Sequence, residues 1–194
     1  MPNLTTTKTG LSTLKRAAAH RMVLGTPAKR TVILLDTSGS MATFADGDRD
    51  RLDVALDALR AVVPTAKGPT TLLQFNDKVR HFTLEGRLPQ AAGSTYILQA
   101  LQAAMQTFPK PSQLFLISDG EPTDNKHDIL AYARTLGIPI FTYGVGPGTH
   151  QDFLDELAHC TGGTHSSDAT DMKFLQQTLT KLLITSDAGN GIAL

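Results

Sequence analysis

The residues able to do chemistry gather in three short segments. Residues 36–40 (DTSGS) follow an apolar run, residues 94 and 95 open an expected helix, and residue 119 follows a second apolar run. Together the segments offer two carboxylates and three hydroxyls, from Asp36, Ser38, Ser40, Thr95 and Asp119. Oxygen ligands suit a hard divalent cation, and Mg²⁺ takes about six of them in octahedral geometry. We therefore expect one Mg²⁺ site, with Mn²⁺ and Ca²⁺ as alternative ions.

The elements that must position these segments alternate along the chain. Apolar runs predict strands over residues 31–35, 70–75, 113–117, 138–143 and 163–166, and period-two alternation predicts a hairpin partner over residues 79–84. Helical spacing of apolar residues predicts helices over residues 52–63, 96–108, 128–136, 151–160 and 172–184. This alternation indicates a three-layer α/β/α, Rossmann-like fold, whose mainly parallel sheet has one antiparallel edge strand. Ligands bind such sheets beyond the carboxyl ends of the strands, so the strands ending at Asp36 and Asp119 mark the expected site.

The pattern Asp36-x-Ser38-x-Ser40, followed by Thr95 and then Asp119, resembles the metal-ion-dependent adhesion site of von Willebrand factor A domains. The resemblance implies that the three hydroxyls coordinate the ion and that the aspartates bind it directly or through water. It also implies that a carboxylate of a partner protein, from an Asp or a Glu, fills the open position. The residue at position 94 is serine where many relatives have a second glycine, which bears on how tight that loop is.

Composition is that of a globular protein without disulfides. Of the 194 residues, 41% are hydrophobic and 19% are charged, and Cys160 is the single cysteine. No apolar run reaches the roughly 18 residues of a membrane helix, and the N-terminal residues lack the apolar region of a secretory signal. We expect a cytoplasmic protein with no membrane partner. The resemblance is accordingly closest to intracellular bacterial or phage members, many of which work beside an AAA+ ATPase of the MoxR or chelatase type, so it implies such a partner.

Charge divides the chain into a basic N-terminal part and an acidic remainder. Residues 1–30 carry six Lys or Arg and no acid, whereas residues 31–194 carry the other 12 Lys and Arg and all 18 Asp and Glu. We expect a basic N-terminal arm or helix over residues 1–29, a von Willebrand factor A domain over residues 30–185 and a flexible tail over residues 186–194. No aromatic residue interleaves the basic residues of the arm, so stacking on nucleic-acid bases has no support.

Enzyme signatures are absent from the sequence. No G-x-x-x-x-G-K-[ST] loop exists, Asp36 lacks the second aspartate of haloacid-dehalogenase-like phosphatases, and Thr149 replaces the third glycine of a dinucleotide loop. His159, Cys160 and His165 fit no standard zinc spacing. We expect a metal-dependent interaction module and no enzymatic activity. The alternative is a phosphoester hydrolase at the same ion, whose base would come from the nearby acids Asp46, Asp48, Glu121 and Asp124.

Overall fold

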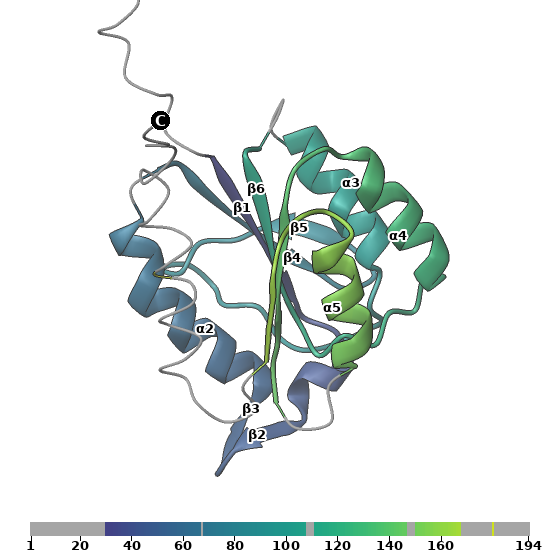
Figure 1. Cartoon of the computed structure of the whole chain (residues 1–194). Helices are drawn as coiled ribbons and strands as arrows, with labels where there is room; N and C mark the ends of the chain where they lie inside the picture. Colours follow the sequence, from purple (N-terminus) through teal and green to yellow (C-terminus); the bar gives the residue numbers. More distant parts are fainter. Residues whose placement is uncertain (1–29, 67, 108–110, 147–149, 168–179, 181–194) are drawn as a thin grey trace, which may run out of the picture.

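The computed structural model of the protein describes residues 30–66, 68–107, 111–146, 150–167 and residue 180. A six-stranded sheet runs through the centre in the order β5-β4-β1-β6-β7-β8 (Figure 1). Its strands are β1 (Thr31–Asp36), β4 (Thr70–Phe75), β5 (Val79–His81), β6 (Gln113–Ser118), β7 (Ile140–Gly144) and β8 (His165–Ser167). All neighbours pair in parallel except β5, which is antiparallel to β4 at the edge. The predicted mainly parallel sheet with one antiparallel edge strand is confirmed.

Helices cover both faces of the sheet (Figure 1). Helix α2 (Arg51–Val62) packs on one face, and α3 (Ile97–Thr107), α4 (Lys126–Thr135) and α5 (Gln151–His159) pack on the other. Successive residues of β1 alternate between the two layers: Ile33 contributes to the core beneath α2, whereas Leu34 contributes to the core beneath α3 to α5. The all-apolar run of β1 therefore reflects burial on both faces, and the three-layer α/β/α fold is confirmed.

Two local features differ from the sequence-based expectation. Strand β5 ends at His81 instead of continuing to residue 84, and beyond it Phe82 and Leu84 pack against the core under α2. A small hairpin of β2 (Phe44–Asp46) and β3 (Arg49–Asp50) was not predicted, since its strands are too short to show periodicity. Short 3₁₀ turns, η1 (Gly39–Ala42) and η2 (Val63–Thr65), complete the elements. The basic arm, the helix expected over residues 172–184 and the tail lie outside the described residues, apart from residue 180.

The order of the strands creates a switch point at β1. From β1 the chain goes to β4 on one side and later to β6 on the other. The loops that leave β1 and β6 at their carboxyl ends consequently diverge, and a crevice between diverging loops is where this class of sheet binds ligands. Asp36 is the last residue of β1, and Asp119 directly follows β6.

Candidate metal centre

Asp36 lies wholly buried at the end of β1. Its Oδ1 accepts a hydrogen bond from the backbone N–H of Ser38 at 2.8 Å, and its Oδ2 accepts one from the hydroxyl of Ser118 at 2.6 Å. Burial raises the pKa of this carboxyl to about 7, although the bonds from Ser118 and Ser38 oppose the shift; the nearby charge of Asp119 adds to it. In this buried position the carboxyl is stabilised by a bound proton, and a nearby cation would stabilise its ionised form.

The two serines of the first loop lie side by side. Ser38 is buried, and its Oγ is 3.0 Å from the Oγ of Ser40, within hydrogen-bond distance. The backbone N–H of Gly39, between them, donates to the carbonyl of Gly93 at 2.9 Å. The hydroxyl loop after β1 is thereby tied to the segment that leads to Thr95.

Thr95 is buried just before α3. Its N–H donates to the hydroxyl of Thr123 at 3.0 Å, and its carbonyl accepts from the N–H of Thr123 at 2.8 Å, so its loop is joined to the loop after β6. The carboxylate of Asp77 accepts from the N–H of Ser94 at 3.0 Å and leaves no room for a Cβ at position 93, where Gly93 has φ +79°. Serine at position 94 is therefore compatible with a tight loop, because the close approach occurs at Gly93.

Asp119, the second carboxylate of the set, is paired with an arginine. Its Oδ2 accepts from Nη1 of Arg51 at 2.8 Å, and both side chains are buried. Its Oδ1 is also buried but has no hydrogen-bond partner among the described residues. A Cβ at Gly146, in the loop after β7, would lie 2.6 Å from Nε of Arg51, so the guanidinium packs directly on that glycine backbone.

Sequence reasoning missed Arg51 and Ser118. Arg51 is the first residue of α2, and a cation at a helix N-terminus opposes the helix dipole, which was the available signal that it serves something other than its own helix. Ser118 adjoins Asp119 in the sequence and could have been included on that ground. Its hydroxyl connects the two carboxylate loops, since it donates to Asp36 and accepts from the N–H of Gly120 at 3.0 Å.

Other candidate groups do not converge on this centre. Asp124 accepts from the N–H of Leu98 at 2.6 Å at the start of α3, and Glu121 is an exposed side chain 3.5 Å from His150. Neither carboxylate contacts Asp36 or Asp119 in the part of the chain that the structure describes.

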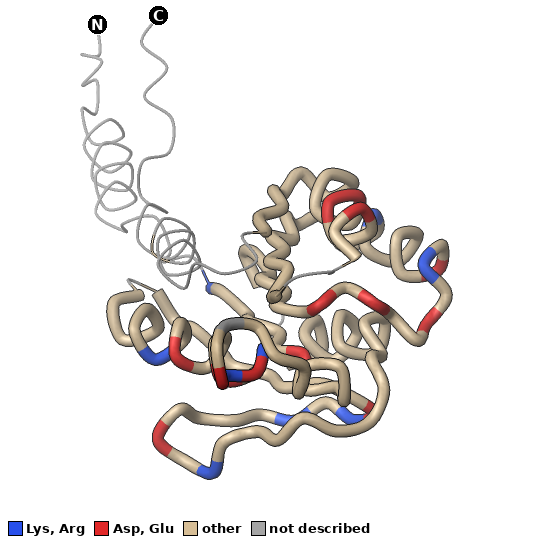
Figure 2. Tube along the Cα trace, turned by 90° about the horizontal axis from the view of Figure 1, so that it is seen from below, with Lys and Arg blue, Asp and Glu red and all other residues tan. Residues whose placement is uncertain are grey.

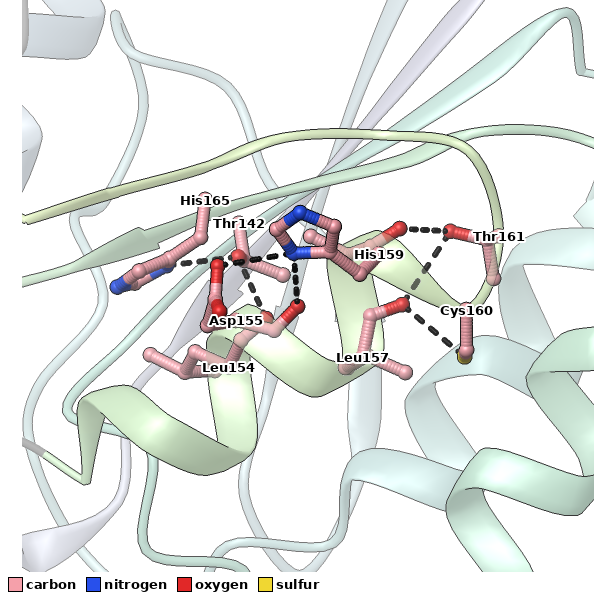
Figure 3. Close-up of polar contacts among 9 residues, drawn as sticks. Thr142, Leu154, Asp155, Leu157, His159, Cys160, Thr161 and His165 are labelled. Carbon is pink, nitrogen blue, oxygen red and sulfur yellow. Dashed lines mark hydrogen bonds and ion pairs between the residues drawn. The ribbon is translucent and has the colours of Figure 1, made fainter.

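The sulfur and imidazole groups near the end of α5 have separate partners (Figure 3). His159 Nδ1 lies 3.1 Å from the carboxylate of Asp155, and Cys160 Sγ donates to the carbonyl of Leu157 at 3.3 Å. His165 Nδ1 lies 2.9 Å from the hydroxyl of Thr142. Among the described residues no group of three or more His, Cys, Asp and Glu could hold a metal ion. A cation at the carboxyl ends of β1 and β6 would accordingly rely on hydroxyls as well as two carboxylates.

The family of the chain follows from its sequence match. Residues 31–181 match the model of the von Willebrand factor type A domain. The chain belongs to this family. It is 30% identical over 113 residues to matrilin-3 from Gallus gallus, a match that covers 50% of this chain and 25% of matrilin-3. The chain thus spans about a quarter of that relative.

Solved structures share the fold of this von Willebrand factor A domain. An aerotolerance-related membrane protein from Bacteroides fragilis is 19% identical with a TM-score of 0.67, covering 79% of this chain and 98% of the other. The manganese-loaded TRAP protein from Plasmodium vivax is 16% identical with a TM-score of 0.62, covering 81% of this chain and 73% of the other. At these identities the likeness concerns the fold alone. None of the described helices is long and apolar enough to cross a membrane.

Proposed function

We propose that this von Willebrand factor A domain binds one divalent cation, Mg²⁺ in the cell, and uses it to engage an acidic side chain of a partner protein. The ion would be held by the set that the sequence predicts, namely Asp36, Ser38, Ser40, Thr95 and Asp119. The single observation that supports this best is Oδ1 of Asp119, a buried carboxylate oxygen without a hydrogen-bond partner among the described residues. A buried acceptor is normally satisfied, and a cation would satisfy this one.

Charge balance supports a role in gripping an anion. Asp36 and Asp119, once both are ionised, carry two negative charges, and Arg51 compensates one of them. A divalent ion added to this set leaves one net positive charge in a largely buried surrounding. The bound ion would supply a strong attraction for one further anionic oxygen, which a carboxylate of the partner provides.

The wider setting is also part of the proposal. We place the protein in the cytoplasm and propose no enzymatic activity, because the sequence has no phosphate-binding G-x-x-x-x-G-K-[ST] loop, no second aspartate of the haloacid-dehalogenase type and no complete dinucleotide loop. The partner class that we propose, an AAA+ ATPase of the MoxR or chelatase type, rests on the resemblance of the sequence to intracellular members of the family.

Calorimetry with Mg²⁺ and Mn²⁺ tests the ion site. Ser40→Ala removes one hydroxyl without changing any charge, and Asp36→Ala removes a carboxylate at a strand end; both should weaken or abolish binding while the fold persists. Asp128→Asn, an exposed acid on α4, is the matched control and should bind as the wild type does. Unchanged affinity in Asp36→Ala would show that the ion site lies elsewhere. A pull-down from the native host with Mg²⁺ or with EDTA then tests whether the partner depends on the ion.

A further inference from the structure

A basic cavity lies beside the candidate metal centre, between the β4–β5 edge of the sheet and the segment 82–92. Its volume is about 630 Å³, and Arg80, His81 and Arg87 line it. No acidic residue is among those that line it. Within the described residues, neither Arg80 nor Arg87 makes an ion pair. Two guanidiniums without a carboxylate partner face a space large enough for an acidic side chain and part of its backbone.

The backbone of Thr37 and Ala92 lies between the cavity and the metal centre. Thr37, which lies between Asp36 and Ser38, lines the cavity, and so does Ala92. The carbonyl of Thr37 accepts from the N–H of Ala92 at 2.8 Å, and the next residue, Gly93, is bonded to the serine loop. A ligand in the cavity therefore lies against the same backbone that positions the hydroxyls of the ion site.

The residues that line the cavity differ in charge from the β2–β3 hairpin. The turn of the β2–β3 hairpin carries the exposed Asp48, and Asp50 caps the N-terminus of α2. Figure 2, a view onto this end of the molecule, shows charges of both signs along these segments. The segment around β5 carries Asp77 and Glu85 as well as Lys78, Arg80 and Arg87, but neither acid lines the cavity. Because residues 31–194 have an excess of six acids, a cavity lined by cations and free of acids stands out from its surroundings. An acidic ligand would be repelled on the hairpin side and attracted on the β5 side.

We propose that this cavity binds a second carboxylate of the same partner, so that the domain recognises an acidic peptide segment and not an isolated Asp or Glu. One carboxylate meets the ion, and another meets Arg80 and Arg87, whose planar guanidiniums suit bidentate contact with a carboxylate. This inference rests on the proposed function for the first carboxylate. The second contact is that of exposed side chains, so it weakens as ionic strength rises.

The experiment measures fluorescence anisotropy of two labelled Gly/Ser peptides, one with six consecutive aspartates and one with a single aspartate. Each is titrated in Mg²⁺ and in EDTA with the wild type, with R80Q/R87Q and with the control R134Q. Arg134 lies on α4, across the sheet from the cavity, so R134Q removes one positive charge of the same kind at a distant position. Since Arg80 and Arg87 are exposed, the double variant should melt as the wild type does.

We expect R80Q/R87Q to bind the six-aspartate peptide about tenfold more weakly, because two exposed ion pairs are lost. R134Q should bind it as the wild type does, and the single-aspartate peptide should bind equally to the wild type and R80Q/R87Q in Mg²⁺. Unchanged binding in R80Q/R87Q, an equal loss in R134Q, or no binding of the six-aspartate peptide to the wild type would overturn the inference. If EDTA abolishes binding and R80Q/R87Q has no effect, the ion-dependent function is supported and the cavity is not a carboxylate-binding site. If EDTA has no effect and R80Q/R87Q reduces binding, the cavity binds a carboxylate and the ion-dependent function is wrong.

Discussion

Replacing Arg51 by methionine should have opposite effects on stability and on metal affinity. Arg51→Met keeps an unbranched apolar stem but removes the cation that pairs with Asp119 at 2.8 Å. Without metal, Asp119 would then be a buried carboxylate with no compensating charge. With metal, the divalent ion would supply that charge itself. The substitution should therefore destabilise the metal-free protein strongly and the metal-bound protein weakly.

The expected magnitude follows from the burial of the pair. The side chains of Arg51 and Asp119 are only 10% and 4% exposed. Two unit charges about 4 Å apart interact by about 4 kcal/mol at an effective dielectric constant of about 20, and breaking a buried pair costs about 3–5 kcal/mol. For a chain of this size about 4 kcal/mol lowers the melting temperature by roughly 8–16 °C. If saturating Mn²⁺ reduces the loss to about 1 kcal/mol, the thermodynamic cycle requires Mn²⁺ to bind the variant about 100-fold more tightly.

Urea or thermal unfolding in EDTA and in Mn²⁺, together with calorimetric titration of Mn²⁺, measures all sides of this cycle. Arg49→Met is the matched control, since Arg49 makes a more exposed ion pair with Asp57 at 3.2 Å. It should change stability by less than about 1 kcal/mol and leave Mn²⁺ affinity unchanged. An equal loss of stability with and without Mn²⁺ in Arg51→Met, with unchanged Mn²⁺ affinity, would refute the idea that the guanidinium and the ion share Asp119.

Three further substitutions test the loops of the centre. Burial raises the pKa of Asp36 to about 7 from its ordinary 3.8, so the folded state binds the proton more tightly than the unfolded state. In EDTA the wild type should therefore lose up to about 4 kcal/mol of folding stability as pH rises from about 4 to 7. Asp36→Asn should flatten this pH dependence in urea unfolding and abolish Mn²⁺ binding; an unchanged slope would contradict the assignment. Gly93→Ala should destabilise the protein by more than about 1 kcal/mol, because φ is +79° and the new Cβ would collide with the Asp77 carboxylate; a melting temperature equal to that of the wild type would contradict it. Thr95→Ala should weaken binding of the six-aspartate peptide more than binding of Mn²⁺, and equal losses in anisotropy and calorimetry would make Thr95 a structural residue only.

Much of the fold was predictable because local pattern and burial agree. Between their ends the runs of β1 and β6 are apolar, as expected of strands buried on both faces, and each strand ends at a polar residue that is itself buried, Asp36 or Ser118. Asp36, Ser38, Ser40 and Asp119 were predictable as candidates because they lie at or just after those strand ends, and Thr95 because it precedes a predicted helix and matches the family pattern.

The electrostatic partners of the site were not predictable in the same way. Arg51 meets Asp119 across 68 residues of sequence, and Asp77 meets Ser94 across 17, so neither contact leaves a periodic or local trace. The lack of room for a Cβ at Gly93 and at Gly146 likewise depends on side chains from distant segments, Asp77 and Arg51. Such pairings are properties of the assembled sheet, and only the three-dimensional arrangement shows that one carboxylate of the site already has a cation.

The central position of β1 also affects the order in which the protein can form. Thr31 pairs with Thr70 on one side and with Gln113 on the other, so β1 has partners 39 and 82 residues further along the chain. At about 5–20 residues per second of synthesis, the ribosome needs roughly 4–17 s after Asp36 before Asp119 exists. Throughout that interval the apolar strand has no complete sheet to join, and parallel pairings of such long range form slowly. A nascent chain stopped before β6 should therefore be a chaperone substrate, and the proposed ion site can form only after β1 has paired with β6.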